Sequence, residues 1–342
     1  MKAPTDQRGV AWPSLQDPAQ DAAVLEVVHE TRYAYSSPVA TAQHRLHLRP
    51  LQDERQTLLD WHLVTDPTPG HERHGRDVFG NELSWVQVDR PHSHLAITAT
   101  SRVQVMPSPP LDAHATVSWE SLRDRLRYMA AGHFEPAVEF AQPSPFVPRL
   151  AALRDWVAAS FACGTPVGLG ALDLMHRLHD GFEYRSRSTE VHTPLAQAFA
   201  QRAGVCQDFA HLMIGGLRML GLPARYVSGY LLTVTEGDRA PLVGADASHA
   251  WVQVWCPSTL DAGPPGQGAW VDLDPTNDLV VSTDHVRLAV GRDYGDVAPV
   301  RGVIQGGGRH GLSVGVTTRR LGPARELLEG LCKGATAANE RH

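Results

Sequence analysis

The chain has 342 residues, of which 42% are hydrophobic and 20% are charged, and its formal net charge is −6. This composition excludes a disordered polyelectrolyte, and the length allows a buried core in two domains or in one large one. The acidic balance gives no electrostatic reason to expect a nucleic-acid partner.

Four cysteines, Cys163, Cys206, Cys256 and Cys332, lie 43, 50 and 76 residues apart. No CxxC pair exists, which excludes a zinc ribbon or a thioredoxin-type motif, and the cysteines are too sparse for a secreted disulfide scaffold. No run approaches the roughly 18 apolar residues of a membrane span, and the N-terminus lacks the apolar stretch of a signal peptide. We expect a cytoplasmic protein with no membrane partner, no metal and no cofactor.

The first part of the chain changes character at Val24. Residues 1–23 are polar and rich in Pro, Gln and Asp, which predicts a disordered tail. From Val24 on, segments with strand-like patterns are separated by turn signals such as "SSP", "DPTPG" and "FGNE". Residues 24–108 are therefore predicted to form an all-β, sandwich-like domain.

A proline-rich linker over 106–116 precedes a helical region. Helical periodicity is clear in the segments 118–129, 149–161 and 171–182. A fourth helix is expected to start with Thr193 as N-cap and Pro194 at its first position.

From Ala224 the apolar period returns to two. Helices first and strands afterwards predict an α+β fold rather than alternating βαβ units. We assign 109–320 to this core, including closing C-terminal strands, and 321–342 to a C-terminal tail. "GGGRHG" near 306 lacks the Lys-Ser/Thr of a phosphate loop and is predicted to be a turn.

Cys206 lies at the predicted start of a long amphipathic helix. Apolar residues recur at three- and four-residue steps up to Leu220, and Gly221 with Pro223 ends the helix. The partial positive charge of a helix N-terminus favours a thiolate, and free N–H groups of its first turn can hold an oxyanion. Cys206 is therefore either a nucleophile or a small buried side chain, since cysteine often packs as a hydrophobe.

The strand "SHAWVQVW" offers a base for that thiol. By alternation Ala250, Val252, Val254 and Cys256 face the core, while His249, Trp251, Gln253 and Trp255 share a face that we expect to be a cleft or lightly covered. A thiolate nucleophile needs a histidine, and the histidine needs an orienting partner. In "AWVDLDPT" both Asp272 and Asp274 lie on one face, so alternation leaves the choice between them open.

Three blocks, "GVCQDFAHLMIGGLRMLGLPARYVSGY", "DASHAWVQVW" and "WVDLDPTN", resemble the catalytic blocks of the transglutaminase-like superfamily. "VVHETRYAYSSPV", "FGNE" and "SRVQV" resemble the β-rich N-terminal region of its bacterial branch, and "HVRLAVGRDYGDVAPVRGVIQGGG" resembles the segment after its core. The resemblance covers about residues 24–318. It implies a papain-like core in which a helix-mounted cysteine packs on an antiparallel sheet.

The resemblance also implies the chemistry. The nucleophile falls on Cys206, the general base on His249 and the orienting acid on Asp274, so that Asp274 is chosen over Asp272 by resemblance alone. The implied reaction is thiolate attack on an amide of a peptide or protein, followed by release of the acyl-thioester by water or by an amine. Hydrolysis and transamidation are not separated by the sequence, nor is the oligomeric state.

Five neighbours are weighed beside the triad. Tyr184 and Gln201 are possible second oxyanion donors, the latter by loose analogy with papain-like enzymes. Asp208 could touch the site, although helix capping is the simpler role, and Asp246 could line the rim or cap a loop. Trp251 is expected to line the cleft. The rival hypothesis is a non-catalytic protein-interaction module that keeps the scaffold.

Overall fold

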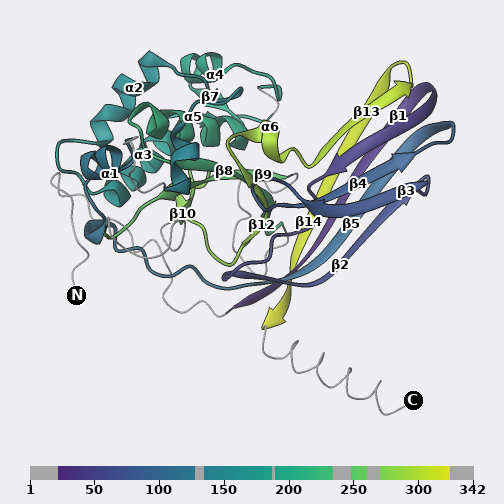
Figure 1. The fold of residues 1–342 in the computed structure, drawn as a ribbon, viewed down its shortest axis with the longest axis horizontal. Helices are drawn as coiled ribbons and strands as arrows, with labels where there is room; N and C mark the ends of the chain where they lie inside the picture. Colours follow the sequence, from purple (N-terminus) through teal and green to yellow (C-terminus); the bar gives the residue numbers. More distant parts are fainter. Residues whose placement is uncertain (1–21, 128–134, 187–188, 234–247, 260–269, 324–342) are drawn as a thin grey trace, which may run out of the picture.

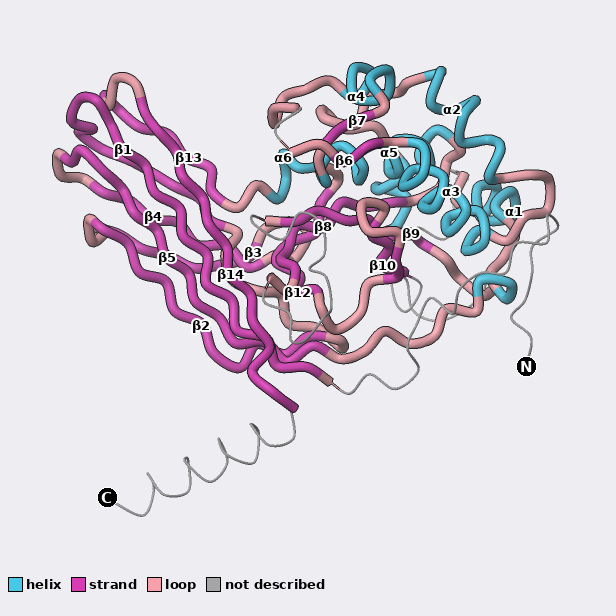
Figure 2. The backbone as a smooth tube through the Cα atoms, turned by 180° about the vertical axis from the view of Figure 1, so that it is seen from behind, coloured by secondary structure: helices cyan, strands magenta, loops and turns pink. Residues whose placement is uncertain are grey.

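The computed structural model describes residues 22–127, 135–186, 189–233, 248–259 and 270–323. The predicted tails 1–23 and 321–342 lie almost entirely outside the described residues. The chain forms two lobes: one contains the helices and a small sheet, and the other is an elongated group of strands (Figures 1 and 2). No helix among the described residues is both long and apolar enough to cross a bilayer.

The elongated lobe contains seven antiparallel strands. They are β1 (Ala23–Leu46), β2 (Gln56–Asp66), β3 (His71–Arg76), β4 (Glu82–Val88), β5 (His92–Val105), β13 (Val300–Gly306) and β14 (His310–Pro323). The first half of β1 pairs with β5 and β14, whereas its second half pairs with β4 and β13. The strand therefore runs through two layers, and an apolar cluster that includes Val39, Leu46, Val86 and Ile97 lies between them.

The strands of this lobe differ from the prediction in two ways. Two expected strands are halves of β1, because the "SSP" segment is a bend rather than a turn: Ser36 and Ser37 donate backbone hydrogen bonds to Arg309 and Gly307. The expectation that C-terminal strands close the core is wrong, since β13 and β14 pair with β1 instead. Gly306, Gly307 and Gly308 have positive φ and form the predicted turn between them.

The helical lobe contains the second sheet. Its helices are α1 (Trp119–Arg125), α2 (Ala151–Val157), α3 (Val167–Gly181), α4 (Leu195–Gln201), α5 (Cys206–Met219) and α6 (Tyr294–Val297), with 3-10 turns η1 (Ala113–Ala115), η2 (Pro136–Ala141) and η3 (Ala158–Ser160). Its strands are β6 (Glu183–Tyr184), β7 (Ala203–Gly204), β8 (Ala224–Leu231), β9 (His249–Trp255), β10 (Trp270–Asp274), β11 (Leu279–Val280) and β12 (His285–Gly291). The five-stranded sheet has the order β11-β10-β9-β8-β12, and all its pairs are antiparallel.

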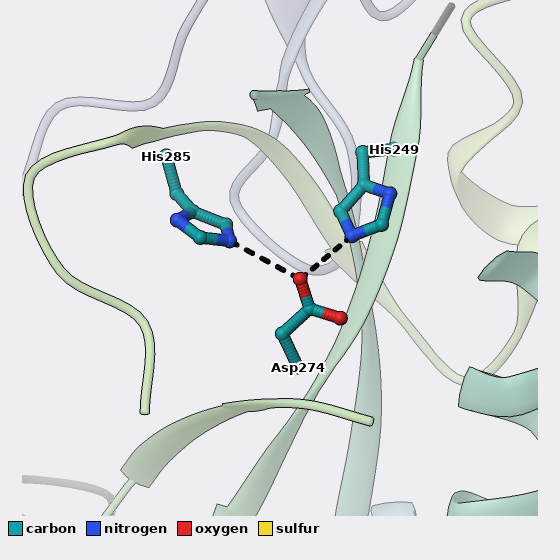
Figure 3. A group of neighbouring side chains, drawn as sticks. All are labelled: His249, Asp274 and His285. Carbon is teal, nitrogen blue, oxygen red and sulfur yellow. Dashed lines mark hydrogen bonds and ion pairs between the residues drawn. The ribbon is translucent and has the colours of Figure 1, made fainter. Parts of the chain in front are cut away.

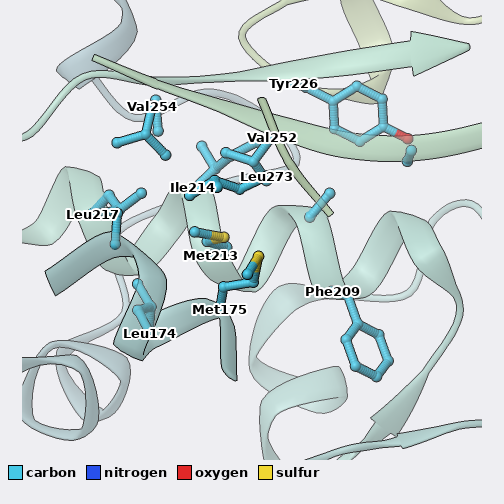
Figure 4. Packing of buried hydrophobic residues seen from close by; sticks show 14 of the residues in the cluster. Leu174, Met175, Phe209, Met213, Ile214, Leu217, Tyr226, Val252, Val254 and Leu273 are labelled. Atoms are coloured by element: carbon cyan, nitrogen blue, oxygen red, sulfur yellow. The ribbon is translucent and has the colours of Figure 1, made fainter. Parts of the chain in front are cut away.

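Helix α5 is the centre of this lobe. Its apolar stripe, Phe209, Met213, Ile214 and Leu217, packs with Val252, Val254 and Leu273 of the sheet and with α3 (Figure 4). The helix ends as predicted, with Leu220 as C-cap and Gly221 at φ +80°. Because α5 is buried along almost its whole length, its first residue is held at a fixed place.

The start of α4 is one residue later than predicted. Pro194 is the N-cap and Leu195 the first helical residue, while the Thr193 hydroxyl accepts a hydrogen bond from the backbone N–H of Glu190. Arg202, in the left-handed conformation at φ 50°, ends the helix and turns the chain into β7. This turn brings the chain directly to the start of α5.

The two lobes are joined by buried polar contacts. The Asn81 amide group donates to the Val290 carbonyl and accepts from its N–H. The Tyr230 hydroxyl lies 3.0 Å from Nδ1 of His29, and Gln56 contacts the backbone of Arg287. Since Asn81, Gln56 and His29 are buried and each also has a partner in the helical lobe, the elongated lobe is an integral part of the fold.

Candidate active site

Cys206 is the first residue of α5, and its side chain is partly exposed. The N-cap is Val205, whose carbonyl accepts from the N–H groups of Asp208 and Phe209, so the N–H groups of Cys206 and Gln207 have no acceptors inside the helix. The sulfur thus lies where the helix dipole and these N–H groups favour negative charge. This is the environment that the sequence predicted for Cys206.

Asp208 caps the nucleophile helix rather than reaching the site. Its carboxylate accepts hydrogen bonds from the backbone N–H of Val205 at 2.9 Å and from the Thr189 hydroxyl at 2.6 Å. Gly204 makes this possible, because a Cβ there would lie 2.6 Å from Cβ of Asp208. Burial raises the pKa of Asp208, while these two hydrogen bonds lower it. The capping role that the sequence favoured for Asp208 agrees with these contacts.

His249 is the first residue of β9, and its side chain is fully buried. Its Nε2 donates to Oδ2 of Asp274 at 2.9 Å. Nδ1 has no partner within ordinary hydrogen-bond geometry among the described residues. After the charge of Asp274, the charge of the Cys206 sulfur raises the histidine pKa further. Because Nε2 is bound to Asp274, Nδ1 is the ring nitrogen left for another partner.

Asp274 ends β10 and receives hydrogen bonds on both oxygens. Oδ1 accepts from the backbone N–H groups of Thr276 at 2.9 Å and Asn277 at 3.3 Å. Oδ2 accepts from His249, and also from Nδ2 of Asn277 at 2.8 Å. The backbone of the Asp-Pro-Thr-Asn turn thus binds Oδ1, while Oδ2 is directed toward His249.

A second imidazole binds the same oxygen. Nε2 of His285, the first residue of β12, lies 3.3 Å from Oδ2 of Asp274, and the two histidines approach it from different sides (Figure 3). The sequence analysis missed His285, because a single histidine at the start of a strand carries no spacing signal. The tertiary structure alone brings it to Asp274.

The buried pair has strongly shifted pKa values. Burial alone would lower the pKa of His249, but the charges of Asp274 and Cys206 and the hydrogen bond to Asp274 raise it to about 10. Burial alone would raise the pKa of Asp274, but the charge and hydrogen bond of His249, followed by the His285 hydrogen bond, hold it well below its usual range. The site therefore keeps an imidazolium and a carboxylate at neutral pH.

The neighbouring acid, Asp272, has different partners. Its Oδ1 accepts from Nε1 of Trp251 at 2.8 Å, and its Oδ2 accepts from Gln253 at 2.9 Å and from Arg55 at 3.2 Å. Arg287 lies 3.7 Å away. The choice between the two acids, which alternation left open, is thus decided geometrically: Asp274 contacts His249, and Asp272 binds arginines.

The face that carries Trp251 is not a cleft. Trp251 is 0% exposed and Gln253 is 1% exposed, which contradicts the prediction of a lightly covered face. Leu51 and Phe79 of the elongated lobe pack on Trp251, and the missing side chain at Gly229 leaves room for its ring. Trp251 lies behind the site, with its ring 6.2 Å from that of His249 and 5.2 Å from that of His285.

Of the three remaining predicted neighbours, Tyr184 and Gln201 lie among the described residues. Tyr184 is partly buried on β6 and pairs with Gly204, two residues before Cys206. Gln201 is the exposed last residue of α4, and no contact brings it to Cys206. Asp246 lies outside the described residues. Tyr184 therefore remains the better placed of the two predicted oxyanion donors.

Donor atoms of His249, Asp274 and His285 lie within 4.8 Å of one another, a spacing that a metal ion could bridge. Both Nε2 atoms are already hydrogen-bonded to the same carboxylate oxygen, and a metal would have to replace both hydrogens. The hydrogen bonds account for the cluster, and we assign no metal to it.

Two family models match the chain. Residues 25–104 match the bacterial transglutaminase-like N-terminal region, and residues 149–275 match the transglutaminase-like superfamily core. The second match contains Cys206, His249 and Asp274. The chain belongs to the transglutaminase-like superfamily. His285, β13 and β14 lie after the matched residues, although β13 and β14 complete the N-terminal lobe.

Relatives cover nearly the whole chain. An uncharacterised protein of Mycobacterium tuberculosis is 38% identical over 294 residues, 85% of this chain and 90% of the relative. A protein-glutamine gamma-glutamyltransferase of Pseudomonas aeruginosa is 32% identical over 136 residues, 38% of this chain and 18% of that protein. A solved structure from Cytophaga hutchinsonii, described as a candidate cysteine protease, superposes with a TM-score of 0.65 at 22% identity and covers 89% of this chain and 92% of that one. This last likeness shows the fold.

Proposed function

We propose that the protein is a cysteine-dependent amide hydrolase or acyltransferase that acts on peptide or glutamine-type amides. The observation that carries the proposal is the position of His249, which is hydrogen-bonded to a buried carboxylate through Nε2 and leaves Nδ1 to the sulfur at the start of α5. A partly exposed thiol with a buried base and acid behind it is the arrangement of a nucleophile in covalent catalysis.

In the proposed reaction the Cys206 thiolate attacks the amide carbonyl carbon, and the carbonyl electron pair moves onto oxygen. Backbone N–H groups of the first turn of α5, with Tyr184 as a candidate side-chain donor, stabilise this oxyanion. The C–N bond then breaks while His249 gives its proton to the leaving amine, and an acyl-thioester remains. Water or a second amine attacks the thioester, His249 takes a proton from it, and the thiolate is restored.

Asp274 keeps its negative charge throughout these steps. Its role is to hold His249 in one orientation and to stabilise the imidazolium, because the carboxylate accepts the Nε2 hydrogen in a dry environment. The substrate partner is then a protein or peptide, and a cytoplasmic location is part of the same proposal.

Alkylation tests the proposal without a known substrate. Iodoacetamide should label Cys206 at least tenfold faster than Cys163 at pH 6–7, as followed by mass spectrometry of the peptides. Cys163 is a control within the same chain, because its thiol is free and exposed. Equal labelling rates at the two cysteines would favour the non-catalytic interaction module.

Hydrolysis and transamidation are separated by a second experiment. A glutamine-bearing peptide is incubated with the protein in the presence and absence of a primary amine. Incorporation of the amine identifies an acyltransferase, and conversion of glutamine to glutamate or cleavage of the peptide identifies a hydrolase. The Cys206→Ala variant is the control for each product.

A further inference from the structure

The shared carboxylate oxygen gives His285 a role of its own. Among the described residues, Oδ2 of Asp274 has three donors, and His285 is the one that comes from β12. A carboxylate can only accept, so the hydrogen of His285 lies on Nε2. Both side chains are almost completely buried, at 1% and 0% exposure, and water therefore cannot easily replace the contact.

His285 also packs against the support of the base. Its ring is perpendicular to that of Trp251, with centroids 5.2 Å apart, and Trp251 stacks on His249. Nδ1 of His285 has no partner among the described residues, so the ring is held through Nε2 and through this packing. The imidazole thus contacts both the acid of the site and the tryptophan behind its base.

From this geometry we infer that His285 is a positioning residue for the reaction: it fixes the Asp274 carboxylate toward His249 and so sustains the thiolate–imidazolium pair. Without it, Oδ2 keeps only His249 and the Asn277 side chain, and the carboxylate can turn toward the backbone N–H groups of Thr276 and Asn277. This inference rests on the proposed function, since it concerns the same nucleophile.

The test compares two substitutions of similar size. His285→Leu fills the space without a donor, whereas His285→Gln retains an N–H that can reach Oδ2. The second-order rate of Cys206 alkylation is measured between pH 4 and 9, together with melting temperature. We expect His285→Leu to lower the rate at pH 6 at least tenfold and to move the acid limb of the profile to higher pH, and His285→Gln to restore both.

Each other outcome has a distinct meaning. If both variants show the same pH profile of alkylation as the wild type, and the wild type is labelled fast, the positioning role of His285 is overturned. The proposed function then still stands. A lower melting temperature with an unchanged pH profile also overturns the positioning role, because that is the signature of a structural role alone. A wild-type Cys206 no more reactive than Cys163 overturns the proposed function and this inference together.

A different observation carries a second inference, on the elongated lobe. The outer face of the layer β3-β4-β1-β13 contains a groove of about 740 Å³. Arg45, Arg73 and Arg301 line it, and the Arg73 guanidinium lies 4.5 Å from the centre of the Trp85 ring. Glu72 is the one acidic lining residue, and it is paired with His74 at 3.3 Å.

The arginines of this groove lack acidic partners within the described part of the chain. Among residues that the structure describes, Arg45 and Arg73 have no carboxylate within ion-pair distance, and Arg301 donates to the Gly295 carbonyl of α6. The chain as a whole has a net charge of −6, so this local excess of positive charge is not a general property of its surface. Guanidinium groups beside an aromatic face bind carboxylates well, because two N–H groups can meet two oxygens.

We propose that this groove binds an acidic peptide segment. Its volume lies within the range of ligand pockets and is larger than one carboxylate side chain needs. Its Arg301 end adjoins α6, whose Tyr294 N–H donates to His211 on the nucleophile helix.

Direct binding tests this without any need for catalysis. A fluorescein-labelled peptide with six glutamates is titrated with the full chain at about 50 mM salt, and fluorescence anisotropy is read. The double variant Arg45→Glu, Arg73→Glu should bind at least tenfold more weakly. The control Arg125→Glu, Arg154→Glu makes the same charge change at exposed arginines of α1 and α2 and should bind like the wild type.

Two results overturn this second inference. Equal binding by the wild type and the groove variant means that the arginines do not take the peptide. A single-stranded oligonucleotide that binds more tightly than the peptide, with the same dependence on Arg45 and Arg73, overturns the peptide as the ligand class. The proposed function is untouched by either result, since the measurement does not involve Cys206.

Discussion

Two acids on one short strand show how position decides the role of a carboxylate. Asp272 and Asp274 lie on the same face of β10, two residues apart, and both are buried. Asp272 binds Arg55 and Arg287 and links the lobes, whereas Asp274 binds two histidines at the site. The same chemical group thus pairs with arginines at one place and with histidines at the other, and the partners make the difference.

The largest effect should come from Asp274→Asn. The amide cannot stabilise the imidazolium and can present the wrong hydrogen to His249, so we expect the turnover rate to fall by about 10³–10⁴-fold. Cys206 labelling at pH 6 should slow in parallel. A loss smaller than tenfold, in a variant shown to be folded by circular dichroism, would contradict the role given to Asp274.

Asp272→Asn should lower the stability of the protein and leave the reactivity of Cys206 nearly unchanged. It leaves Arg55 and Arg287 without their buried carboxylate, and breaking such a pair costs about 3–5 kcal/mol of the free energy of unfolding. The rate of Cys206 labelling at 15 °C, where the variant is still folded, should change less than about threefold. The reason is that Asp272 makes no contact with His249. Urea denaturation measures the first effect. Strong loss of labelling with little loss of stability would mean that the two roles are interchanged.

The pH dependence of stability separates the two acids further. The pKa of His249 is raised to about 10, so its stabilising contribution is complete below about pH 6.5 and is lost as pH rises toward 10. The pKa of Asp274 is lowered, so its contribution is present above about pH 4 and is lost at lower pH. The stability difference between wild type and Asp274→Asn should therefore be largest near pH 4–6.5 and shrink toward pH 10.

Urea titrations at four pH values between 4 and 10 would measure this difference. Asp272→Asn is the matched control, because the ion-pair partners of Asp272 are arginines and not histidines. Its stability difference should not shrink between pH 6.5 and 10. A parallel decline in both variants would show that the effect is general and does not come from His249.

The smallest effect is expected for Arg55→Met. The Arg55 side chain is 22% exposed, and Arg287 remains beside Asp272, so the unfolding free energy should fall by only about 1–2 kcal/mol. Cys206 labelling should not change. The melting temperature measures the loss, and a drop as large as that of Asp272→Asn would show that Arg55 alone compensates the carboxylate.

Much of the site could be predicted from local pattern. The helical period predicted α5 and placed Cys206 at its start, and alternation placed Ala250, Val252 and Val254 toward the core. Both signals depend on neighbours within a few residues, which the sequence displays directly. The choice of Asp274 came from the family resemblance, since alternation treats the two acids alike.

Other features could not be predicted because they join distant segments. Leu51 and Phe79 from the other lobe pack against the buried cluster that contains Trp251, and the sequence of β9 does not predict this contact. The return of β13 and β14 to β1 pairs residues nearly 300 positions apart, such as Leu25 with Arg320. A sequence can indicate that a strand has an edge to be paired, but it does not show which other strand will pair with it.

The sequence by itself determined the helix that presents Cys206, the strands that carry His249 and Asp274, and their order along the chain. Periodicity decides these features, because each one follows from which local face is apolar. Only the tertiary structure decided which carboxylate meets the base, and that His285 shares its oxygen. Those contacts depend on how β9, β10 and β12 lie side by side, and hydrogen bonds between separate strands are set by packing rather than by spacing along the chain.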